Sequence, residues 1–144
     1  MLKRHELNPI IKPSMLKPSL EGYNVLGAFN PGATIFNNQV ILLLRVAENC
    51  LIKKGFYTIP YYEFKNGKGE PRILEIPCTD PNVNLKDTRG IFYNGRDYLS
   101  SISHIRIARS TDGINFTIDA KPFIFPNRES EGFGVEDARI SKIG

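Results

Sequence analysis

The chain has 144 residues, of which 41% are hydrophobic and 24% charged, and its formal net charge is +4. This length supports one ordinary hydrophobic core, and a mild basic excess without a dense basic run argues against a nucleic-acid partner. The longest apolar stretch, residues 40–52, is too short and too often interrupted to span a membrane, and residues 1–16 lack the continuous apolar segment of a secretory signal. We therefore expect a soluble cytoplasmic protein that binds neither nucleic acid nor membranes.

Apolar residues alternate with polar ones through most of the chain, which is typical of β-strands. Residues 33–48 contain Asn37-Asn38 between two apolar runs, and residues 90–110 contain Asn94-Gly95 in the same position. The segment 56–77 has the sequence "NGKG" near its centre. Because Asn and Gly tolerate the positive φ of tight turns, each of these three segments predicts a β-hairpin.

The C-terminal third continues the pattern. Asp112-Gly113 predicts a turn, followed by a strand in which Ile114 and Phe116 alternate with polar neighbours. Residues 135–144, "VEDARISKIG", predict a further strand that stops on a glycine without its partner, as if the chain were cut short. Repeated hairpins of this kind favour the four-stranded blades of a β-propeller, and the chain is long enough for roughly two blades.

Cysteine and histidine contribute little to the functional prediction. Cys50 and Cys78 are too few for a disulfide scaffold and too far apart for a C-x-x-C site, so we expect two reduced thiols in the core. His5 and His104 have no other His or Cys at metal-ligand spacing, and no metal is predicted. We expect His104 at the surface; the alternative is that it borders a polar cleft with two nearby arginines, Arg106 and Arg109.

Four segments occur along the chain: "AFNPGA" (28–33), "ILLLRVAE" (41–48), "SHIRIARSTDGINF" (103–116) and "GVEDARI" (134–140). Together they resemble the N-terminal part of glycoside hydrolase family 130, whose members are mostly β-mannoside phosphorylases. The resemblance implies an all-β, five-bladed β-propeller of which this chain holds roughly the first two blades. Residues 1–144 would then be the N-terminal part of a single catalytic domain, inactive by itself.

The resemblance also implies roles for individual residues. The Asp of the family's G-x-E-D-P-R motif is its general acid, and that position is Asp137. The Asn of F-N-P-G and the Arg of L-L-R contact the sugar next to the cleaved bond, and they correspond to Asn30 and Arg45. We expect Glu136 to contact substrate as well. Ala138 replaces a proline found in many members, which removes no functional group, and the family's phosphate-binding residues lie mainly downstream of this segment.

Without the resemblance, each of these residues has a simpler explanation. Glu136 and Asp137 could merely open a strand after a glycine-rich loop, Arg45 could extend from an edge strand to solvent, and Asn30 could only form a turn. If residues 136–139 are extended, Glu136 and Asp137 point to opposite sides and only one faces the sugar. Arg139 would then share a face with Asp137 and lower its pKa, unless it points elsewhere or the proton passes through a sugar hydroxyl, as the resemblance favours.

The predicted reaction is inverting phosphorolysis of β-1,2- or β-1,4-linked manno-oligosaccharides to α-mannose 1-phosphate, with inorganic phosphate as co-substrate and no cofactor. Because phosphate is already charged, one acid and a basic pocket suffice, and no second carboxylate is needed to activate water. The alternatives are a hydrolytic propeller acting on β-mannosides or furanosides and a noncatalytic sugar-binding propeller. As protein partners we expect a second copy of the chain or the C-terminal remainder of the propeller.

Overall fold

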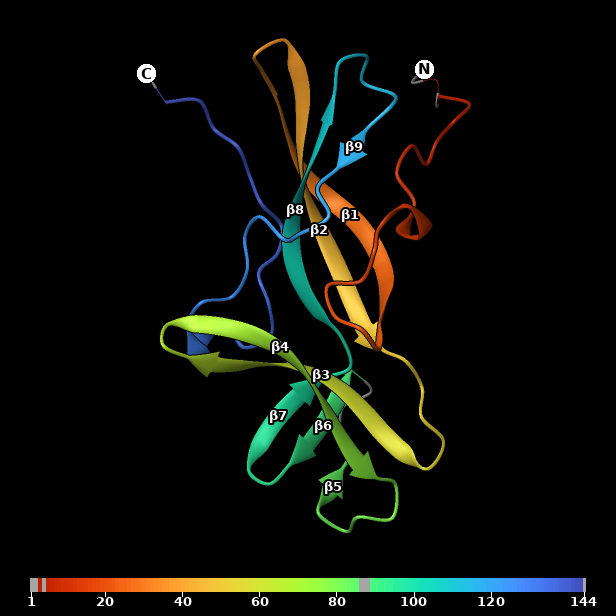
Figure 1. The fold of residues 1–144 in the computed structure, drawn as a ribbon, viewed down its shortest axis with the longest axis vertical. Coiled ribbons are helices and arrows are strands. Elements are labelled where there is room, and N and C mark those ends of the chain that lie inside the picture. Colours follow the sequence, from red (N-terminus) through yellow and green to blue (C-terminus); the bar gives the residue numbers. More distant parts are fainter. Residues whose placement is uncertain (1–2, 4, 86–88, 144) are drawn as a thin grey trace.

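The computed structural model describes residues 3, 5–85 and 89–143, and strands dominate this part of the chain. The prediction of an all-β chain is therefore confirmed. Figure 1 shows a four-stranded sheet in one half of the molecule and two smaller sheets in the other. In chain order the elements are η1 (Pro13–Met15), β1 (Tyr23–Phe36), β2 (Gln39–Cys50), β3 (Phe56–Lys65), β4 (Lys68–Pro77), β5 (Val83–Asn84), β6 (Gly90–Tyr93), β7 (Arg96–Leu99), β8 (Ile102–Ser110), β9 (Thr117–Ile118) and η2 (Glu129–Glu131).

The largest sheet has the antiparallel order β1-β2-β8-β9. Its two central strands are adjacent in space although β3 to β7 separate them in sequence, so β2 and β8 bring together residues about 60 positions apart, such as Arg45 opposite Ile105. β3 and β4 form a hairpin, and β5, β6 and β7 form a third sheet. These two smaller sheets share a core around Ile59, Ile76 and Ile91.

Each of the three predicted hairpin turns contains asparagine, and all three hairpins are confirmed. Asn37 and Asn38 have φ of 48° and 57° between β1 and β2. The turns between β3 and β4 and between β6 and β7 are Asn-Gly pairs, Asn66-Gly67 and Asn94-Gly95, again with positive φ at both residues. Two such residues in succession give the backbone twist that a two-residue hairpin requires.

Of the two strands predicted in the C-terminal third, one begins later than expected and the other does not form. After β8 the turn at Asp112 extends further than expected, because its carboxylate accepts hydrogen bonds from the backbone N–H groups of Ile114 and Asn115, both at 2.8 Å. The next strand, β9, therefore begins only at Thr117. Residues 135–143 form no strand at all, and Gly144, where a turn was predicted, lies outside the described residues.

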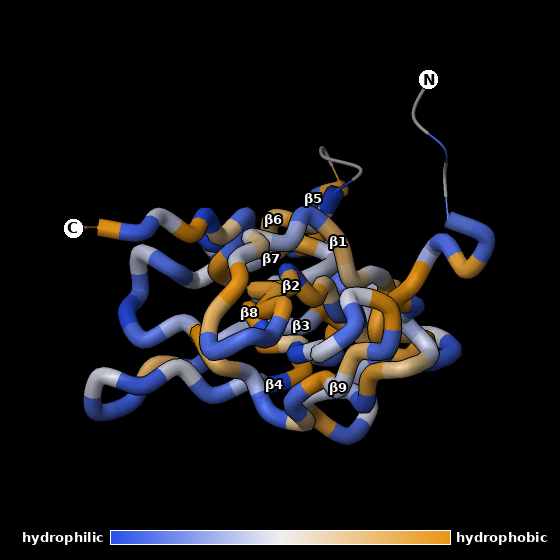
Figure 2. Tube along the Cα trace, turned by 90° about the horizontal axis from the view of Figure 1, so that it is seen from above, coloured by the Kyte–Doolittle hydropathy of each residue, from blue (hydrophilic) through white to orange (hydrophobic). Residues whose placement is uncertain are grey.

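Both faces of β8 are buried. One face packs in two apolar clusters, around Leu44 and Val46 and around Tyr62 and Ile102, and in Figure 2 apolar residues are concentrated along β2 and β8 near the middle of the molecule. His104 lies on this buried face with no exposed surface, so the predicted surface location is wrong. Cys50 is a buried free thiol as expected, whereas Cys78 is exposed. No described helix has the length and apolar character needed to cross a membrane.

Candidate active site

Arg45 lies near the middle of β2 and is surrounded by groups from three other segments. Its Nη1 lies 3.2 Å from Oδ1 of Asp137, its Nη2 forms an ion pair with Glu136, and its Nε donates to Oγ of Ser103 at 3.2 Å. The guanidinium carbon also lies 5.0 Å from the ring centroid of Phe29, its cross-strand neighbour on β1. A planar fork with five donors can satisfy all these partners at once. Arg45 therefore does not simply extend into solvent.

Asn30 completes the cluster through an irregularity in β1. The pairing of β1 with β2 shifts between Phe29 and Gly32, so that two residues of β1 face one of β2. Asn30 lies in this bulge with φ of 46°, and its Nδ2 donates to Oδ1 of Asp137 at 3.2 Å. Proline follows it and has no N–H for the ladder, which fits the bulge. Asn30 thus forms a turn and also reaches the acid.

Two glycines allow the acidic segment to approach the sheet. A Cβ at Gly32 of β1 would lie 2.7 Å from the carbonyl oxygen of Ala138, and a Cβ at Gly134 would lie 2.4 Å from that of Ser103. Gly134 also has φ of 112°, which a larger residue would adopt only with strain. The glycines of the "FNPG" and "GVED" segments therefore bring the segment 134–138 against β1 and β8.

The segment 136–139 is not extended, and this changes the expected geometry. Asp137 has φ of 51°, in the left-handed region, so the condition under which Glu136 and Asp137 would point to opposite sides is not met, and both contact Arg45. Arg139 does not bind the Asp137 carboxylate; its Nη1 donates instead to the backbone carbonyls of Asp137 and Ala138. The four predicted site residues thus form one cluster, and their catalytic roles stay predictions.

Hydrogen bonds and nearby positive charge favour the ionised form of Asp137. The hydrogen bond from Asn30 makes the largest contribution and lowers the pKa of Asp137 below its usual value, and Arg45 and Arg139 act in the same direction. In the absence of substrate this carboxyl is therefore ionised at neutral pH. A general acid needs a proton, so substrate must change these contacts if Asp137 is the acid.

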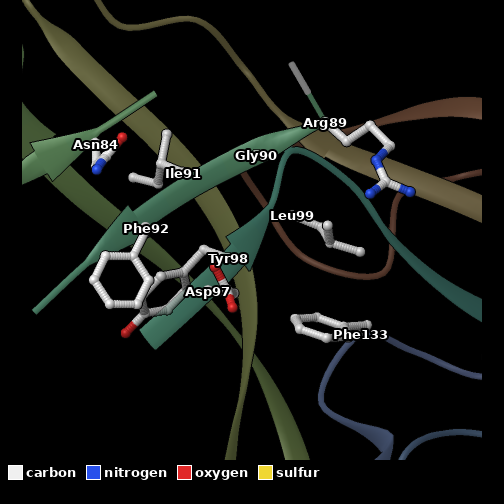
Figure 3. Close-up of a pocket in the computed structure, with 9 residues that line it drawn as sticks. All are labelled: Asn84, Arg89, Gly90, Ile91, Phe92, Asp97, Tyr98, Leu99 and Phe133. Atoms are coloured by element: carbon white, nitrogen blue, oxygen red, sulfur yellow. The ribbon is translucent and has the colours of Figure 1, made fainter. Parts of the chain in front are cut away.

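The cluster is open to solvent. The side chains of Glu136 and Asp137 are 56% and 44% exposed, against 23% for Arg45. A cavity of about 460 Å³ lies elsewhere, over β6 and β7, where Phe133 lies opposite Leu99 (Figure 3), and its lining includes none of the four site residues. Among the residues that the structure describes, no three His, Cys, Asp or Glu side chains are grouped so that they could hold a metal ion.

Comparison with known proteins identifies the chain. The model of glycoside hydrolase family 130, described as β-1,4-mannooligosaccharide phosphorylase, matches residues 80–144. A curated β-1,2-mannobiose phosphorylase from Listeria innocua is 44% identical over 146 residues, covering 98% of this chain. The chain belongs to glycoside hydrolase family 130. A solved structure of β-1,2-mannobiose phosphorylase from Listeria innocua, in complex with β-1,2-mannobiose, matches 98% of this chain with a TM-score of 0.81 and 44% identity.

Membership of family 130 confirms the predicted fold class, because the matched structure is a β-propeller. The chain spans 41% of the length of the relative and of the solved structure. The prediction that residues 1–144 are part of a single catalytic domain is not tested by these matches.

The sequence analysis did not identify two further residues that contact Arg45, namely Ser103 and Phe29. Neither has a residue type that indicates this chemistry, and both reach Arg45 only through strand pairing. Phe29 lies directly opposite Arg45, and Ser103 lies diagonally opposite on β8, two residues before the partner Ile105. The pairing register of β1, β2 and β8 could have identified them, but no local sequence motif could.

In the complete enzyme to which residues 1–144 are predicted to belong, Arg45→Ala is expected to reduce turnover much more than stability. The substitution removes a charged hydrogen-bonding group from a partly exposed cluster, which we expect to lower kcat/KM by about 10- to 100-fold or more. Its ion-pair partners are exposed, so the midpoint of thermal unfolding should move by no more than about 4 °C. Kinetics and thermal unfolding measured on the same preparation check this, and unchanged kinetics would contradict it.

Proposed function

We propose that this chain provides the mannose-binding side and the general acid of an inverting β-mannoside phosphorylase. The observation that carries the proposal is the convergence of Asn30 and Arg45 on the carboxylate of Asp137. The family 130 model covers the segment of Asp137, and the alignment with the 44% identical relative covers 98% of the chain. The relative at 44% identity is a β-1,2-mannobiose phosphorylase, so β-1,2-mannobiose is the first substrate to test. Inorganic phosphate is the co-substrate, and the reaction needs no cofactor.

In the proposed reaction, phosphate attacks the anomeric carbon from the face opposite the departing sugar. The new carbon–oxygen bond gives α-mannose 1-phosphate, and the bond to the leaving oxygen breaks. Asp137 supplies the proton, relayed through a hydroxyl of the mannose, and ends as a carboxylate. Arg45, Asn30 and the exposed carboxylate of Glu136 orient the hydroxyls of the same mannose residue.

Substrate binding would also make Asp137 a better acid. A mannose residue over the cluster removes water from the carboxyl group, and its hydroxyls compete for the donors of Asn30 and Arg45. Both changes raise the pKa of Asp137, because burial disfavours the ionised form and the lost hydrogen bonds no longer stabilise it. The low pKa in the free chain is therefore compatible with a role as an acid in the complex.

The geometry argues against Glu136 as the base of an inverting hydrolase. An inverting hydrolase places a second carboxylate about 6.5 to 9.5 Å from the acid, on the opposite face of the sugar, to activate water. The neighbouring carboxylate, Glu136, binds the same guanidinium as Asp137 and so lies on the same side. It cannot act as the base across the ring.

The test uses a chimera in which this chain replaces the matching 41% of the Listeria innocua enzyme. With β-1,2-mannobiose and phosphate, the chimera should release mannose 1-phosphate, whereas the 144-residue chain alone should not. Mannose release without phosphate would favour a hydrolase, and binding without turnover would favour a noncatalytic propeller. Robust phosphorolysis by the isolated chain would contradict the expectation that further blades are required.

A further inference from the structure

Ser103 lies on β8 between the two segments that carry the site. Its side-chain Oγ accepts the hydrogen bond from Nε of Arg45 at 3.2 Å. Its backbone carbonyl accepts from the N–H of Val135 at 3.0 Å, and it forms a β-bridge with Gly134. Ser103 is only 5% exposed. One buried residue therefore contacts both the strand that carries Arg45 and the segment that carries Asp137.

The contact with Ser103 differs from the other polar contacts of Arg45. The remaining two edges of the guanidinium bind Glu136 and Asp137, whose side chains are largely exposed and acidic. Exposed ion pairs hold a long side chain weakly. A buried acceptor at Nε fixes one edge of the planar group, and because the group is rigid, the direction of Nη1 and Nη2 follows. Phe29 limits movement of the guanidinium at its face.

The backbone of Ser103 has a matching effect on the acidic segment. Any Cβ at residue 134 would collide with the Ser103 carbonyl, so this approach requires glycine at residue 134. The same carbonyl lies 3.4 Å from the buried hydroxyl of Tyr62. Contacts with Gly134 and with Tyr62 thus fix the backbone of Ser103. Its hydroxyl therefore has a defined position relative to Arg45.

We propose that Ser103 is a positioning residue that holds the Arg45 guanidinium against the Asp137 carboxylate. The contact exists whether or not the chain acts on mannosides; its importance for catalysis rests on the function proposed above. Ser103 does not touch substrate, because it is buried beneath Arg45. Its hydroxyl sets where the two terminal nitrogens of Arg45 point, and so whether they meet the acid.

The test measures the pKa of Asp137 in the 144-residue chain by NMR titration of its side-chain carboxyl carbon. Arg45→Ala should raise this pKa by removing a neighbouring positive charge. Ser103→Ala should raise it too, by a smaller amount, because an unanchored guanidinium spends less time at Asp137. Ser103→Thr keeps the hydroxyl and should restore the wild-type value. Ser103→Cys keeps the shape of the side chain but replaces the hydroxyl with a larger, weakly accepting sulfur, and it should behave like Ser103→Ala.

Ser110→Ala is the matched control. Ser110 lies on the same strand, is 4% exposed, and its Oγ accepts from the backbone N–H of Gly113 at 2.9 Å. It is remote from Arg45, so its loss should reduce stability without moving the pKa of Asp137. A general loosening of β8 would move that pKa in both variants, and this outcome would overturn the proposal.

Two further results would overturn it. The first is that Arg45→Ala raises the pKa of Asp137, whereas Ser103→Ala and Ser103→Cys both leave it at the wild-type value. The second is that Arg45→Ala itself does not raise the pKa of Asp137. In the chimera, Ser103→Ala should lower kcat with little change in KM, and Ser103→Thr should recover it. If the chimera lacks phosphorolysis while the pKa shifts occur, the proposed function fails and the positioning role stands.

Discussion

Asp137→Asn in the chimera is expected to lower kcat for phosphorolysis by about 10²- to 10⁴-fold, the usual contribution of general acid catalysis. Asparagine has the size of aspartate, and its Oδ1 can still accept hydrogen bonds from Asn30 and Arg45. It cannot release a proton. Binding of β-1,2-mannobiose should therefore survive, and calorimetry together with steady-state kinetics separates the loss of turnover from any loss of affinity.

The leaving group provides a second test of Asp137. An activated aryl mannoside needs no protonation of its leaving oxygen, so it should recover part of the activity lost in Asp137→Asn if the chimera accepts it. Glu136→Gln serves as the control because it alters the adjacent partner of the same guanidinium. Its effect should be milder and independent of the leaving group. Near-normal activity of Asp137→Asn together with an inactive Glu136→Gln would assign the acid to Glu136.

Local sequence was sufficient for the hairpins. At Asn37-Asn38, Asn66-Gly67 and Asn94-Gly95, the residues that tolerate positive φ occur where the apolar alternation breaks, so propensity and pattern agree. The segment predicted as a strand at 135–144 also shows apolar alternation after a glycine, yet its described residues, 135–143, form no strand. In that segment tertiary contacts determine the backbone conformation: Ala138 packs against Gly32 of β1, and Asp137 adopts a positive φ.

The site was predicted only through the resemblance to family 130. Asn30, Arg45 and Asp137 come from segments up to 107 positions apart, and no periodicity indicates that they meet. What the resemblance could not supply is the shared contact of both carboxylates with one guanidinium. That contact depends on the backbone of residue 137 and on Ser103, whose residue type alone indicates nothing.

His104 was misplaced for a different reason. In "SHIRIARS" the polar residues alternate with isoleucines, which is typical of a strand with one face in solvent. Here the N-terminal segment packs over the face of the sheet that carries His104, where Leu16 joins the core and Ser19 donates a hydrogen bond to Glu48 of β2. Alternation records polarity along one strand and cannot show that a distant segment covers it. The result is a charged cluster inside the sheet packing.

This buried cluster leads to the largest expected effect on stability. Glu48 has no exposed surface; it accepts from the backbone N–H of Ser19 at 2.7 Å and from the Ser19 hydroxyl, and its carboxylate lies 3.7 Å from Nη2 of Arg106. Arg106 Nε donates to Nε2 of His104 at 2.9 Å, and burial, followed by the neighbouring Arg106 charge, lowers the pKa of His104 to about 3. His104 is therefore neutral, and the buried charges are those of Glu48 and Arg106.

Glu48→Ala should destabilise the chain by about 3 to 5 kcal/mol, because it leaves the Arg106 guanidinium buried without a counter-charge and removes both acceptors of Ser19. Urea unfolding monitored by circular dichroism measures the loss. Glu75→Ala is the matched control: its partner Lys53 is exposed, and the cost should be about 1 kcal/mol or less. Equal effects of the two substitutions would contradict the buried-charge explanation.

The double variant Glu48→Leu/Arg106→Met separates the cost of an unpaired charge from the value of the pair. Within the described residues, Nδ1 of His104 and Nη2 of Arg106 make no hydrogen bond, so the network is incompletely satisfied. Removing both charges together should then recover most of the stability lost in Glu48→Ala, because apolar side chains of similar size carry no desolvation penalty. A double variant as unstable as Glu48→Ala would mean that Ser19 and its hydrogen bonds, rather than the charge on Arg106, account for the effect.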